Sequence, residues 1–366
     1  MKTVKVGVIG CGVISANYLI NARKFPILDI VACADVKTDA AEARAKEFGV
    51  PRACTVDELL SNESIEIVLN LTFPSAHAQV ALQAIEAGKH VYNEKPLAVD
   101  RVEGRQILEV AKARGVLVGA APDTFLGAAH QTARHLVDTG QIGRPVAAAC
   151  FYLGSGVKKP HPNMEFFYQA GGGPLFDRGP YFMSDLLQML GPINRVTASA
   201  TTAIPQRPDL REPQGDKLIT VETPDHVSGT LEFANGCLAT MVTSFAVQNA
   251  QFWPITIFGT EGTLRVPSPN SFDGQVLLWR KGEKEEQSAT LTHCTGYGRS
   301  IGLADMAYAI RTGRAHRASG QQGLVVLETM HAMLESAQTG RAVDITCPYE
   351  RSQPLPQNLP AGLLDE

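Results

Sequence analysis

Gly7-Val8-Ile9-Gly10-Cys11-Gly12-Val13-Ile14-Ser15 joins an apolar, strand-like run to closely spaced glycines and then to a helix-like segment. Gly10 permits a tight turn, and Gly12 lets a ligand approach the backbone closely. The helix that starts near Val13 and Ile14 would direct free N–H groups and its positive dipole end at an anion. The stretch therefore predicts a phosphate-binding strand–turn–helix unit.

The chain around this stretch alternates strands and helices up to about residue 122. We expect strands at 4–10, 27–35, 65–71, 90–93 and 116–120, and helices at 14–24, 38–48, 75–87 and 100–114. Thr55 with Glu58 forms a capping-box pattern, and Ser75 and Asp100 are candidate helix caps. Repeated βα units with right-handed crossovers give a doubly wound parallel sheet. Residues 1–122 are therefore predicted to form an α/β domain of the Rossmann type.

The pattern changes from about residue 145. We expect strands at 147–153, 195–203, 227–233, 237–245, 255–258 and 276–279, and helices at 180–190, 301–311 and 321–338. Asn235-Gly236 predicts a hairpin turn, because both residues tolerate positive φ. Residues 123–345 are therefore predicted to form an α+β domain with a largely antiparallel open sheet, including a surface insertion over 205–215. Residues 346–366, which are rich in proline, are expected to form an extended or mobile tail.

The amino-acid composition argues against several classes of partner and binding site. Hydrophobic residues make up 44% of the 366 residues, charged residues 19%, and the net charge is -4, which argues against a nucleic-acid partner. The seven cysteines contain no Cys-x-x-Cys pair and suggest the reduced thiols of a cytoplasmic protein, and the histidines show no metal-ligand spacing. No apolar run approaches the ~18 residues of a membrane span, and the N-terminus leads straight into a strand without a signal region.

Acidic and polar residues at the strand ends suggest how a nucleotide would be bound. Asp35 ends the second strand and can accept hydrogen bonds from an adenosine ribose, while its charge would repel a 2′-phosphate. This predicts NAD as the cofactor and makes NADP less favoured; a plain helix cap is the structural alternative for Asp35. Thr72, Pro74 and His77 follow the third long strand, where loops cover a cofactor in such sheets.

Two further motifs suggest the reactive half of a site. Glu94-Lys95-Pro96 follows a strand, and Lys95 could hydrogen-bond a substrate hydroxyl and stabilise alkoxide character, with Glu94 orienting it. Glu94 and Lys95 are also candidate contacts of the cofactor. The alternative is a surface ion pair. Asp177 and Tyr181 follow three glycines and would share a helix face. Tyr181 could then accept or donate a proton, and Asp177 could bind a sugar hydroxyl or tune Lys95; a half-buried core aromatic is the alternative for Tyr181.

Polar residues near these motifs are candidates for substrate binding. Asp123 and Thr124 follow the last strand of the first domain, and His161 and Asn163 precede the glycine run. Such groups suit several hydroxyls at once, although each by itself is an ordinary loop residue. Lys158, beside Lys159, could meet an anionic substituent or could form a solvated charge pair. Tyr297 and Arg299 are weaker candidates.

The chain resembles the glucose–fructose oxidoreductase / inositol dehydrogenase / rhizopine-catabolism (Gfo/Idh/MocA) family over nearly its whole length. The resemblance is carried by Gly10-x-Gly12, Asp35, Glu94-Lys95-Pro96 and Asp177-x-x-x-Tyr181. Most members have histidine where Tyr181 stands; tyrosine there is similar to the glucose–fructose oxidoreductase branch. The resemblance implies a nicotinamide cofactor, a substrate bound between the domains, and often dimers or tetramers formed through the exposed sheet.

Three functions are compatible with these motifs. The first is an NAD-dependent oxidoreductase that takes a hydride from a secondary hydroxyl of a sugar, glycoside or cyclitol, with Lys95 and Tyr181 handling the proton. The second, which some relatives of the family exemplify, is an NAD-dependent glycoside hydrolase. It acts by transient ring oxidation, elimination and re-reduction, with Tyr181 or His161 as an extra base and an anionic sugar as one substrate class. The third is a non-enzymatic dinucleotide-binding sensor, against which the intact Lys95 and Tyr181 argue.

Overall fold

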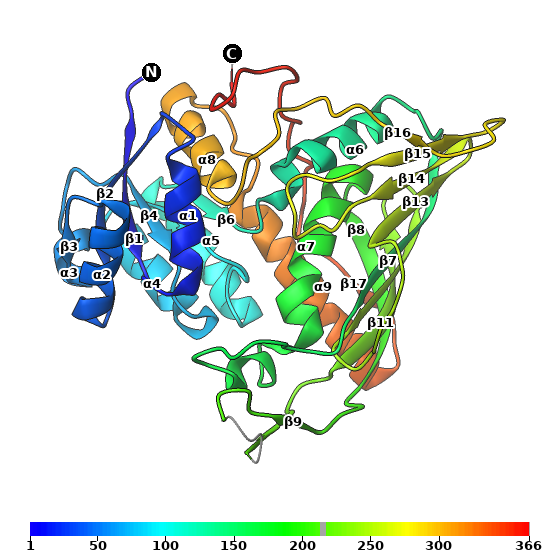
Figure 1. The fold of residues 1–366 in the computed structure, drawn as a ribbon, viewed down its shortest axis with the longest axis horizontal. Helices are drawn as coiled ribbons and strands as arrows, with labels where there is room; N and C mark the ends of the chain where they lie inside the picture. The colour runs from blue at the N-terminus through cyan, green and yellow to red at the C-terminus, as the bar shows by residue number, and fades with distance from the viewer. Residues whose placement is uncertain (213–216, 366) are drawn as a thin grey trace.

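The computed structural model describes residues 1–212 and 217–365, which form two halves that lie side by side (Figure 1). The first half contains a six-stranded sheet with the order β3-β2-β1-β4-β5-β6, and every strand pair in it is parallel. Its strands are β1 (Val4–Ile9), β2 (Leu28–Ala34), β3 (Ala53–Cys54), β4 (Ile67–Asn70), β5 (His90–Asn93) and β6 (Val118–Ala120). Its helices are α1 (Val13–Ala22), α2 (Thr38–Phe48), α3 (Val56–Leu60), α4 (Pro74–Glu86) and α5 (Arg101–Arg114). The predicted Rossmann fold is confirmed.

Local chemistry explains where three of these helices begin. The hydroxyl of Thr55 accepts a hydrogen bond from the N–H of Glu58, whose carboxylate accepts one from the N–H of Thr55, so the predicted capping box is present. Asp100 caps α5 by accepting from the N–H of Val102. The expected Ser75 cap is wrong, because α4 already begins at Pro74. Proline suits the first helical position, where an N–H would have no partner within the helix.

The second half contains a nine-stranded sheet with the order β16-β15-β14-β13-β7-β12-β11-β8-β17. Its strands are β7 (Pro145–Leu153), β8 (Ile193–Thr201), β11 (His226–Phe233), β12 (Leu238–Ser244), β13 (Ile255–Gly259), β14 (Gly262–Val266), β15 (Leu277–Arg280), β16 (Gln287–Ser288) and β17 (Val343–Asp344). Only the β7–β12 pair among the described strands of this sheet is parallel, which confirms the largely antiparallel sheet. The predicted turn at Asn235-Gly236 joins β11 to β12, with Gly236 at φ 85°.

Helices cover one face of this sheet and separate it from the first half (Figure 1). They are α6 (Ala128–Asp138), α7 (Gly173–Leu190) and α9 (Gly320–Thr339), while the remaining helix α8 (Ile301–Thr312) returns to pack against α1 and β6. The expected start of the central helix at residue 180 is wrong, because α7 begins at Gly173 and contains Pro180. Proline favours the first turn of a helix, but burial of α7 on nearly all sides overrides that preference.

The expected surface insertion is only partly a surface loop; its residues 213–215 lie outside the described residues. Short strands β9 (Gln206–Pro208) and β10 (Leu218–Thr220) pair antiparallel, and Arg207 of β9 is buried. The guanidinium of Arg207 donates to the Asp225 carboxylate at 3.1 Å and to the carbonyl oxygen of Phe245 at 2.7 Å. A small separate hydrophobic core lies under this region and contains Met164, Tyr168, Ile219, Val221 and Phe245.

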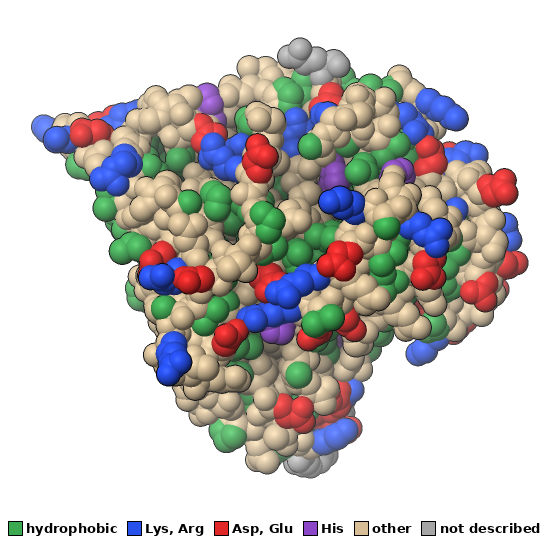
Figure 2. Space-filling model, turned by 180° about the vertical axis from the view of Figure 1, so that it is seen from behind, with side chains coloured by type: hydrophobic (Ala, Val, Ile, Leu, Met, Phe, Trp, Pro, Cys, Tyr) green, Lys and Arg blue, Asp and Glu red, His purple; other side chains and the backbone are tan. Residues whose placement is uncertain are grey.

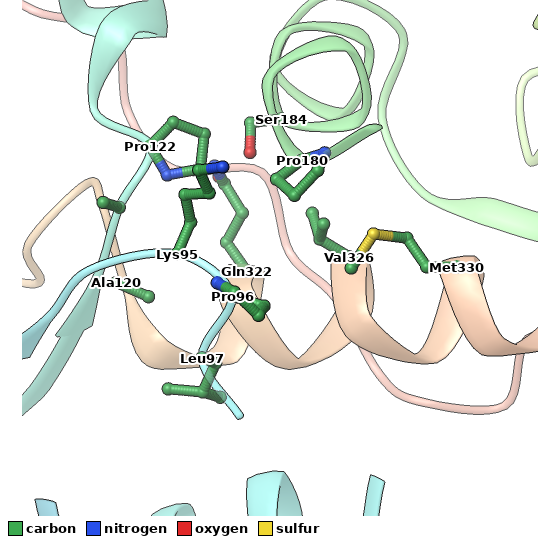
Figure 3. Close-up of a pocket in the computed structure, with 12 residues that line it drawn as sticks. Lys95, Pro96, Leu97, Ala120, Pro122, Pro180, Ser184, Gln322, Val326 and Met330 are labelled. Carbon is green, nitrogen blue, oxygen red and sulfur yellow. The ribbon is translucent and has the colours of Figure 1, made fainter. Parts of the chain in front are cut away.

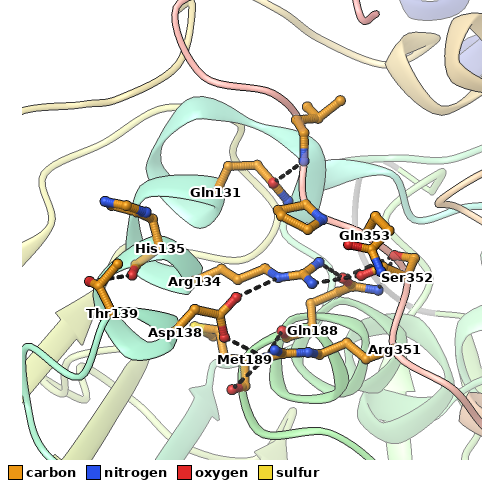
Figure 4. Close-up of polar contacts among 12 residues, drawn as sticks. Gln131, Arg134, His135, Asp138, Thr139, Gln188, Met189, Arg351, Ser352 and Gln353 are labelled. Atoms are coloured by element: carbon orange, nitrogen blue, oxygen red, sulfur yellow. Dashed lines mark hydrogen bonds and ion pairs between the residues drawn. The ribbon is translucent and has the colours of Figure 1, made fainter.

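Buried polar groups anchor the C-terminal tail (Figure 4). Residues 346–365 contain no helix or strand. The buried guanidinium of Arg134 donates to the side chain of Gln188 and to the carbonyl oxygen of Ser352, both at 2.6 Å. The side chain of Gln131 accepts the N–H of Leu355 at 2.9 Å. The tail therefore depends on donors and acceptors of α6 and α7, in addition to the burial of its own Leu355.

The surface carries both signs of charge. On the face seen in Figure 2, acidic and basic side chains are interspersed, in agreement with the net charge of -4. Among the helices of the described residues, none combines the length and the apolarity needed to cross a membrane.

Replacing Arg134 with Met should loosen the tail. The substitution preserves much of the side-chain volume but leaves the acceptors of Gln188 and Ser352 without a charged donor, a loss of roughly 2–4 kcal/mol in the free energy of unfolding. Urea unfolding measures the loss, and limited proteolysis measures exposure of the tail. Arg195→Met, which breaks an exposed ion pair with Asp344, is the control and should cost much less, because solvent screens exposed pairs. Equal losses in both variants would contradict the anchoring role of Arg134.

Candidate active site

An ion pair joins the two halves at the carboxyl edge of the parallel sheet. Lys95 lies in the loop after β5, and its Nζ donates to Oδ1 of Asp177 in α7 and to the backbone oxygen of the same residue, both at 2.9 Å. The other carboxylate oxygen of Asp177 lies 2.9 Å from Nε of Arg178. The Lys95 and Asp177 side chains are only 15% and 12% exposed. The structure therefore brings together two residues that are 82 positions apart in the sequence.

Proline shapes the turn of α7 that faces Lys95. Pro180 has no N–H to donate to the carbonyl oxygen of Phe176, so the hydrogen-bond pattern of the helix is incomplete at this turn. The neighbouring carbonyl oxygen, that of Asp177, accepts the ammonium group of Lys95. The carbonyl oxygen that lacks a helix donor is thus that of Phe176, and Lys95 binds the next carbonyl oxygen along the chain.

The charge states of the pair follow from its surroundings. Burial acts to lower the pKa of Lys95, but Asp177, Tyr181 and Glu94 outweigh it and raise that pKa above its usual value. Burial acts to raise the pKa of Asp177, but Lys95 and Arg178 outweigh it and lower that pKa. At neutral pH the pair is therefore an ammonium and a carboxylate. A lysine held in this state donates hydrogen bonds but does not accept a proton.

Tyr181 lies beside this pair, between two cations. Its side chain is buried, and Nη2 of Arg299 donates to its hydroxyl oxygen at 2.8 Å. The ammonium of Lys95 lies 5.4 Å and the guanidinium of Arg299 5.7 Å from the centroid of the ring, within the range of cation–π attraction. Arg299 also reaches Asn270 at 3.3 Å and Glu94 at 3.4 Å. The sequence marked Arg299 only weakly and did not mark Asn270.

Glu94 is predicted to contact the cofactor, and in the structure it organises the loop. One carboxylate oxygen accepts from the hydroxyl of Tyr18 at 3.0 Å and lies near Arg299, and the other accepts from the N–H of Lys95 at 2.6 Å. Tyr18 is fully buried on α1 and belongs to no motif, so sequence analysis could not find it. The contact of Glu94 with a cofactor stays a prediction.

The glycine loop has the shape that a dinucleotide requires. Gly10 has φ 101°, and a Cβ atom at this position would lie 2.6 Å from the carbonyl oxygen of Leu71. A Cβ atom at Gly12 would meet nothing within 4 Å, so the backbone there is open to a ligand. In the part of the chain that the structure describes, no side chain caps α1, which leaves the first N–H groups, those of Val13 and Ile14, available to a pyrophosphate.

Large apolar side chains surround this loop and remain exposed. Val13, Val36 and Phe73 follow the carboxyl ends of β1, β2 and β4 and are 69%, 92% and 57% exposed. An apolar patch at the edge of a sheet is typical of a surface that a ligand covers. The residues present therefore fit a dinucleotide.

Asp35 connects the end of β2 to the glycine loop. Its carboxylate accepts from the N–H of Cys11 at 2.8 Å and from the N–H of Lys37 at 2.9 Å, and the residue is partly exposed. It does not cap α2, which has no side-chain cap. Each carboxylate oxygen can accept further hydrogen bonds, so Asp35 has acceptor capacity left for a ribose.

His77 joins the cofactor side to the lysine loop. The imidazole is buried, with Nδ1 at 2.7 Å from the carbonyl oxygen of Pro96 and Nε2 at 3.0 Å from that of Thr72. Thr72 in turn donates to the side chain of Asn70, and Pro74 opens α4. These contacts make His77 a bridge between loops, and direct contact of Thr72, Pro74 and His77 with a cofactor stays a prediction.

Asp123 and Thr124 are fully buried. The Asp123 carboxylate accepts from the N–H groups of Ser300 and Gly302 at 3.1 and 3.0 Å, at the start of α8. Burial, opposed in part by Arg299, raises the pKa of Asp123 to about 6. This geometry favours a role in holding the loop that carries Arg299, and it does not favour the predicted contact with substrate, which stays untested.

Lys158, His161 and Asn163 lie together in a loop before the short 3₁₀ helix Glu165–Phe167. Nδ1 of His161 accepts from the N–H of Asn163 at 3.1 Å, and Lys158 is exposed. Among the described residues, no hydrogen bond or ion pair joins this loop to Lys95, Asp177 or Tyr181. Their predicted contact with substrate is untested.

A narrow cavity lies behind the stem of Lys95 (Figure 3). It has room for a water-sized sphere over only about 10 Å³, which corresponds to about one water molecule. The buried hydroxyl of Ser184 lines it and has no hydrogen-bond partner among the described residues. The cavity is therefore too small for a sugar. The lining residues are Lys95, Pro96, Leu97, Ala120, Ala121, Pro122, Pro180, Ser184, Gln322, Gly323, Val326 and Met330.

Replacing Asp123 with Asn should change how stability depends on pH. Because the folded-state pKa of Asp123 is raised from 3.8 to about 6, the wild type loses stability as pH rises through this window. The Asn side chain can still accept from α8 but does not ionise. The free energy of unfolding of the variant should therefore rise relative to the wild type by up to about 3 kcal/mol between pH ~4 and ~7.

Urea unfolding at several pH values measures this difference. Asp39→Asn, which alters an exposed carboxylate in the first turn of α2, is the control. A difference between Asp123→Asn and wild type that stays constant across the window would show that the carboxylate is not perturbed.

Two family models match the chain. The model described as "Oxidoreductase family, NAD-binding Rossmann fold" matches residues 4–121, and the model described as "GFO/IDH/MocA C-terminal domain" matches residues 130–265. Together they span both halves of the structure and both partners of the Lys95–Asp177 ion pair.

Curated relatives and solved structures agree with this assignment. A 1,5-anhydro-D-fructose reductase from Ensifer adhaerens is 29% identical over 348 residues, which cover 93% of this chain and 98% of the relative. A levoglucosan dehydrogenase from Pseudarthrobacter phenanthrenivorans is 28% identical and covers 72% of this chain and 73% of the relative. A solved structure of levoglucosan dehydrogenase with NADH and levoglucosan has a TM-score of 0.83 at 22% identity over 94% of this chain and all of the other. The chain belongs to the Gfo/Idh/MocA family of NAD-binding oxidoreductases.

Proposed function

We propose that this protein is an NAD-dependent dehydrogenase that oxidises a secondary hydroxyl of a sugar, glycoside or cyclitol, or catalyses the reverse reduction. The observation that carries the proposal is the contact of Lys95 with Asp177 and Tyr181 at the carboxyl edge of the parallel sheet. Ligands of open α/β sheets bind at this edge. Relatives whose names denote an anhydrosugar reductase, a levoglucosan dehydrogenase and an inositol 2-dehydrogenase support this substrate class.

The charge states support a division of labour between Lys95 and Tyr181. Lys95 stays cationic, so it donates a hydrogen bond to the reacting oxygen and stabilises negative charge on it. Tyr181 takes the hydroxyl proton in oxidation and returns it in reduction. NAD, when bound, supplies the hydride acceptor, and Asp35 favours it over NADP by repelling a 2′-phosphate.

A substrate panel tests the proposal directly. Purified protein is mixed with NAD or NADP and with free sugars, sugar acids, inositols, levoglucosan and aryl glycosides, while NADH absorbance and aglycone release are followed together. We expect NADH to accumulate with a polyol substrate and NAD to be preferred over NADP. Tyr181→Phe and Lys95→Ala should each lower kcat/KM by about 10²–10⁴-fold. Tyr308→Phe, which removes the hydroxyl of another buried tyrosine, is the control and should retain wild-type turnover.

Three outcomes would contradict parts of the proposal. Aglycone release that needs NAD but leaves no NADH would identify the oxidative glycosidase. NAD binding without turnover of any panel member, together with unchanged NAD binding in Tyr181→Phe, would favour a sensor. Wild-type kcat/KM in Lys95→Ala would show that the ion pair with Asp177 is structural only.

We further propose that the uncovered face of the second sheet forms a homodimer or homotetramer. Leu238 on β12 and Phe258 on β13 are 51% and 42% exposed, and both lie opposite Ala147 of β7. Phe252, 62% exposed, packs its ring against that of Phe151 at 4.8 Å on the same strand. An apolar sheet face of this kind is stabilised when a second copy covers it.

Multi-angle light scattering measures the assembly. The wild type should elute as a dimer or tetramer, and Phe258→Glu should shift it toward smaller species because the substitution buries a charge in the contact. Leu218→Glu, at an exposed position on β10 outside this sheet, is the control. A monomeric wild type, or an assembly unchanged by Phe258→Glu, would contradict the proposal.

A further inference from the structure

On the basis of the function proposed above, we infer that Arg299 is a positioning residue that sets Tyr181 as the acid and base of the reaction. Arg299 lies in the loop before α8 and is 118 residues from Tyr181 in the sequence. It belongs to none of the motifs that carry the family resemblance. Its role is assigned from the contacts that follow.

The hydrogen bond between Arg299 and Tyr181 has a defined direction. A guanidinium has five N–H donors and no acceptor, so the phenol oxygen must accept at the 2.8 Å contact with Nη2. The hydroxyl proton of Tyr181 is then free to point toward another oxygen, such as that of a substrate. When this proton leaves, the guanidinium pairs with the phenolate in a charge-assisted hydrogen bond, which is stronger than one to a neutral phenol.

The charges around Tyr181 favour the same state. The charged groups nearby are Lys95 and Glu94 from the loop after β5, Asp177 and Arg178 from α7, and Arg299, with Asp123 and Tyr18 behind it. Asp177 is committed to Lys95 and Arg178, and Glu94 to Tyr18 and Arg299. Within the described residues no carboxylate is hydrogen-bonded to the phenol oxygen. A phenolate would therefore have Arg299 hydrogen-bonded to its oxygen and Lys95 beside its ring, and both cations already have a carboxylate partner of their own.

Arg299 is held rigidly from both sides. Its side chain is 13% exposed and contacts Glu94 and Asn270. The next residue, Ser300, has φ 89°, which is unusual for a residue with a side chain, and its N–H and hydroxyl bind Asp123 and the carbonyl oxygen of Tyr18. Two residues earlier, the hydroxyl of Tyr297 accepts the N–H of Gly362 from the tail. Backbone strain of this kind persists only where surrounding contacts enforce it.

In oxidation, the substrate O–H bond breaks and its proton moves to the Tyr181 oxygen. The C–H bond of the carbon that carries this oxygen breaks as well, a C=O bond forms, and NAD, when bound, would supply the acceptor for the hydride. In reduction, Tyr181 gives its proton to the carbonyl oxygen, which becomes the hydroxyl of the product. Arg299 stabilises the unprotonated form of Tyr181 that oxidation needs, without touching the substrate.

A titration that needs no substrate tests the inference. The near-ultraviolet absorbance of tyrosinate is followed against pH in wild type, Arg299→Gln, Arg299→Lys and Arg311→Gln, each with and without Tyr181→Phe, so that the difference isolates the hydroxyl at position 181. Arg311 also joins α8 to a glutamate of the first half, Glu66, at 2.7 Å, and it lies outside the site. Thermal unfolding of each variant shows that it is folded.

We expect the midpoint of the Tyr181 titration to rise by about one to two pH units in Arg299→Gln, because an opposite charge within hydrogen-bond distance shifts an acid by about that much. Arg299→Lys retains a positive charge, so its midpoint should lie close to that of the wild type. The midpoint of Arg311→Gln should equal that of the wild type. A midpoint unchanged in Arg299→Gln, or shifted equally in Arg311→Gln, would overturn the inference.

The rate profile supplies the second readout. With levoglucosan and NAD, Arg299→Gln should lower kcat at neutral pH by about 10–100-fold and leave KM within about threefold. With 1,5-anhydro-D-fructose and NADH, the direction that starts from protonated Tyr181, kcat should fall by less than in oxidation. In the oxidation direction kcat should recover as the pH rises. A higher KM with an unchanged pH profile would overturn the inference and make Arg299 an anchor for an anionic substrate. If neither substrate turns over, the proposed function fails for them, and the titration still decides the role of Arg299.

Discussion

The ion pair between Lys95 and Asp177 is the contact on which the site depends, because it is built from one residue of each half. Two charges this little exposed are stable only if each compensates the desolvation of the other. The ion pair therefore fixes the distance between the loop after β5 and the first turns of α7. The other side chains on these two segments are positioned with it. Tyr181, one helical turn after Asp177, comes to lie beside the ammonium group for this reason.

Other buried charged residues around the site are compensated in the same way. Glu94 compensates Arg299, Tyr18 donates to Glu94, and Asp123 fixes the backbone that carries Arg299. Each of these buried charges has a neighbour of opposite sign or an N–H donor, because burying an unpaired charge is costly. In this arrangement the buried phenol of Tyr181 has cations as neighbours, and Lys95, which stays protonated, cannot act as a base. For the proton transfer proposed for Tyr181, Arg299 supplies the cation that a phenolate would need.

Contacts distant from the site make the two halves one structure. The guanidinium groups of Arg101 and Arg105 on α5 meet Glu328 on α9 at 3.5 and 2.6 Å. The tail crosses from the second half to the first, where Leu364 is buried in the core that contains β1. It also donates to Tyr297, so the anchoring of the tail and the placement of Arg299 share one loop.

The sequence by itself determined the features that depend on neighbours along the chain. Glycine spacing and strand–helix alternation predicted the Rossmann half, the Thr55 capping box and the Asn235-Gly236 turn, because backbone conformation and capping are local. The motifs also predicted that Lys95, Asp177 and Tyr181 belong to the active site. Only the tertiary structure decided what they touch: the start of α7 at Gly173 despite Pro180, the burial of Asp123, and the hydrogen bond from Arg299 to Tyr181. These features depend on desolvation and packing between segments more than one hundred residues apart, for which no local pattern exists.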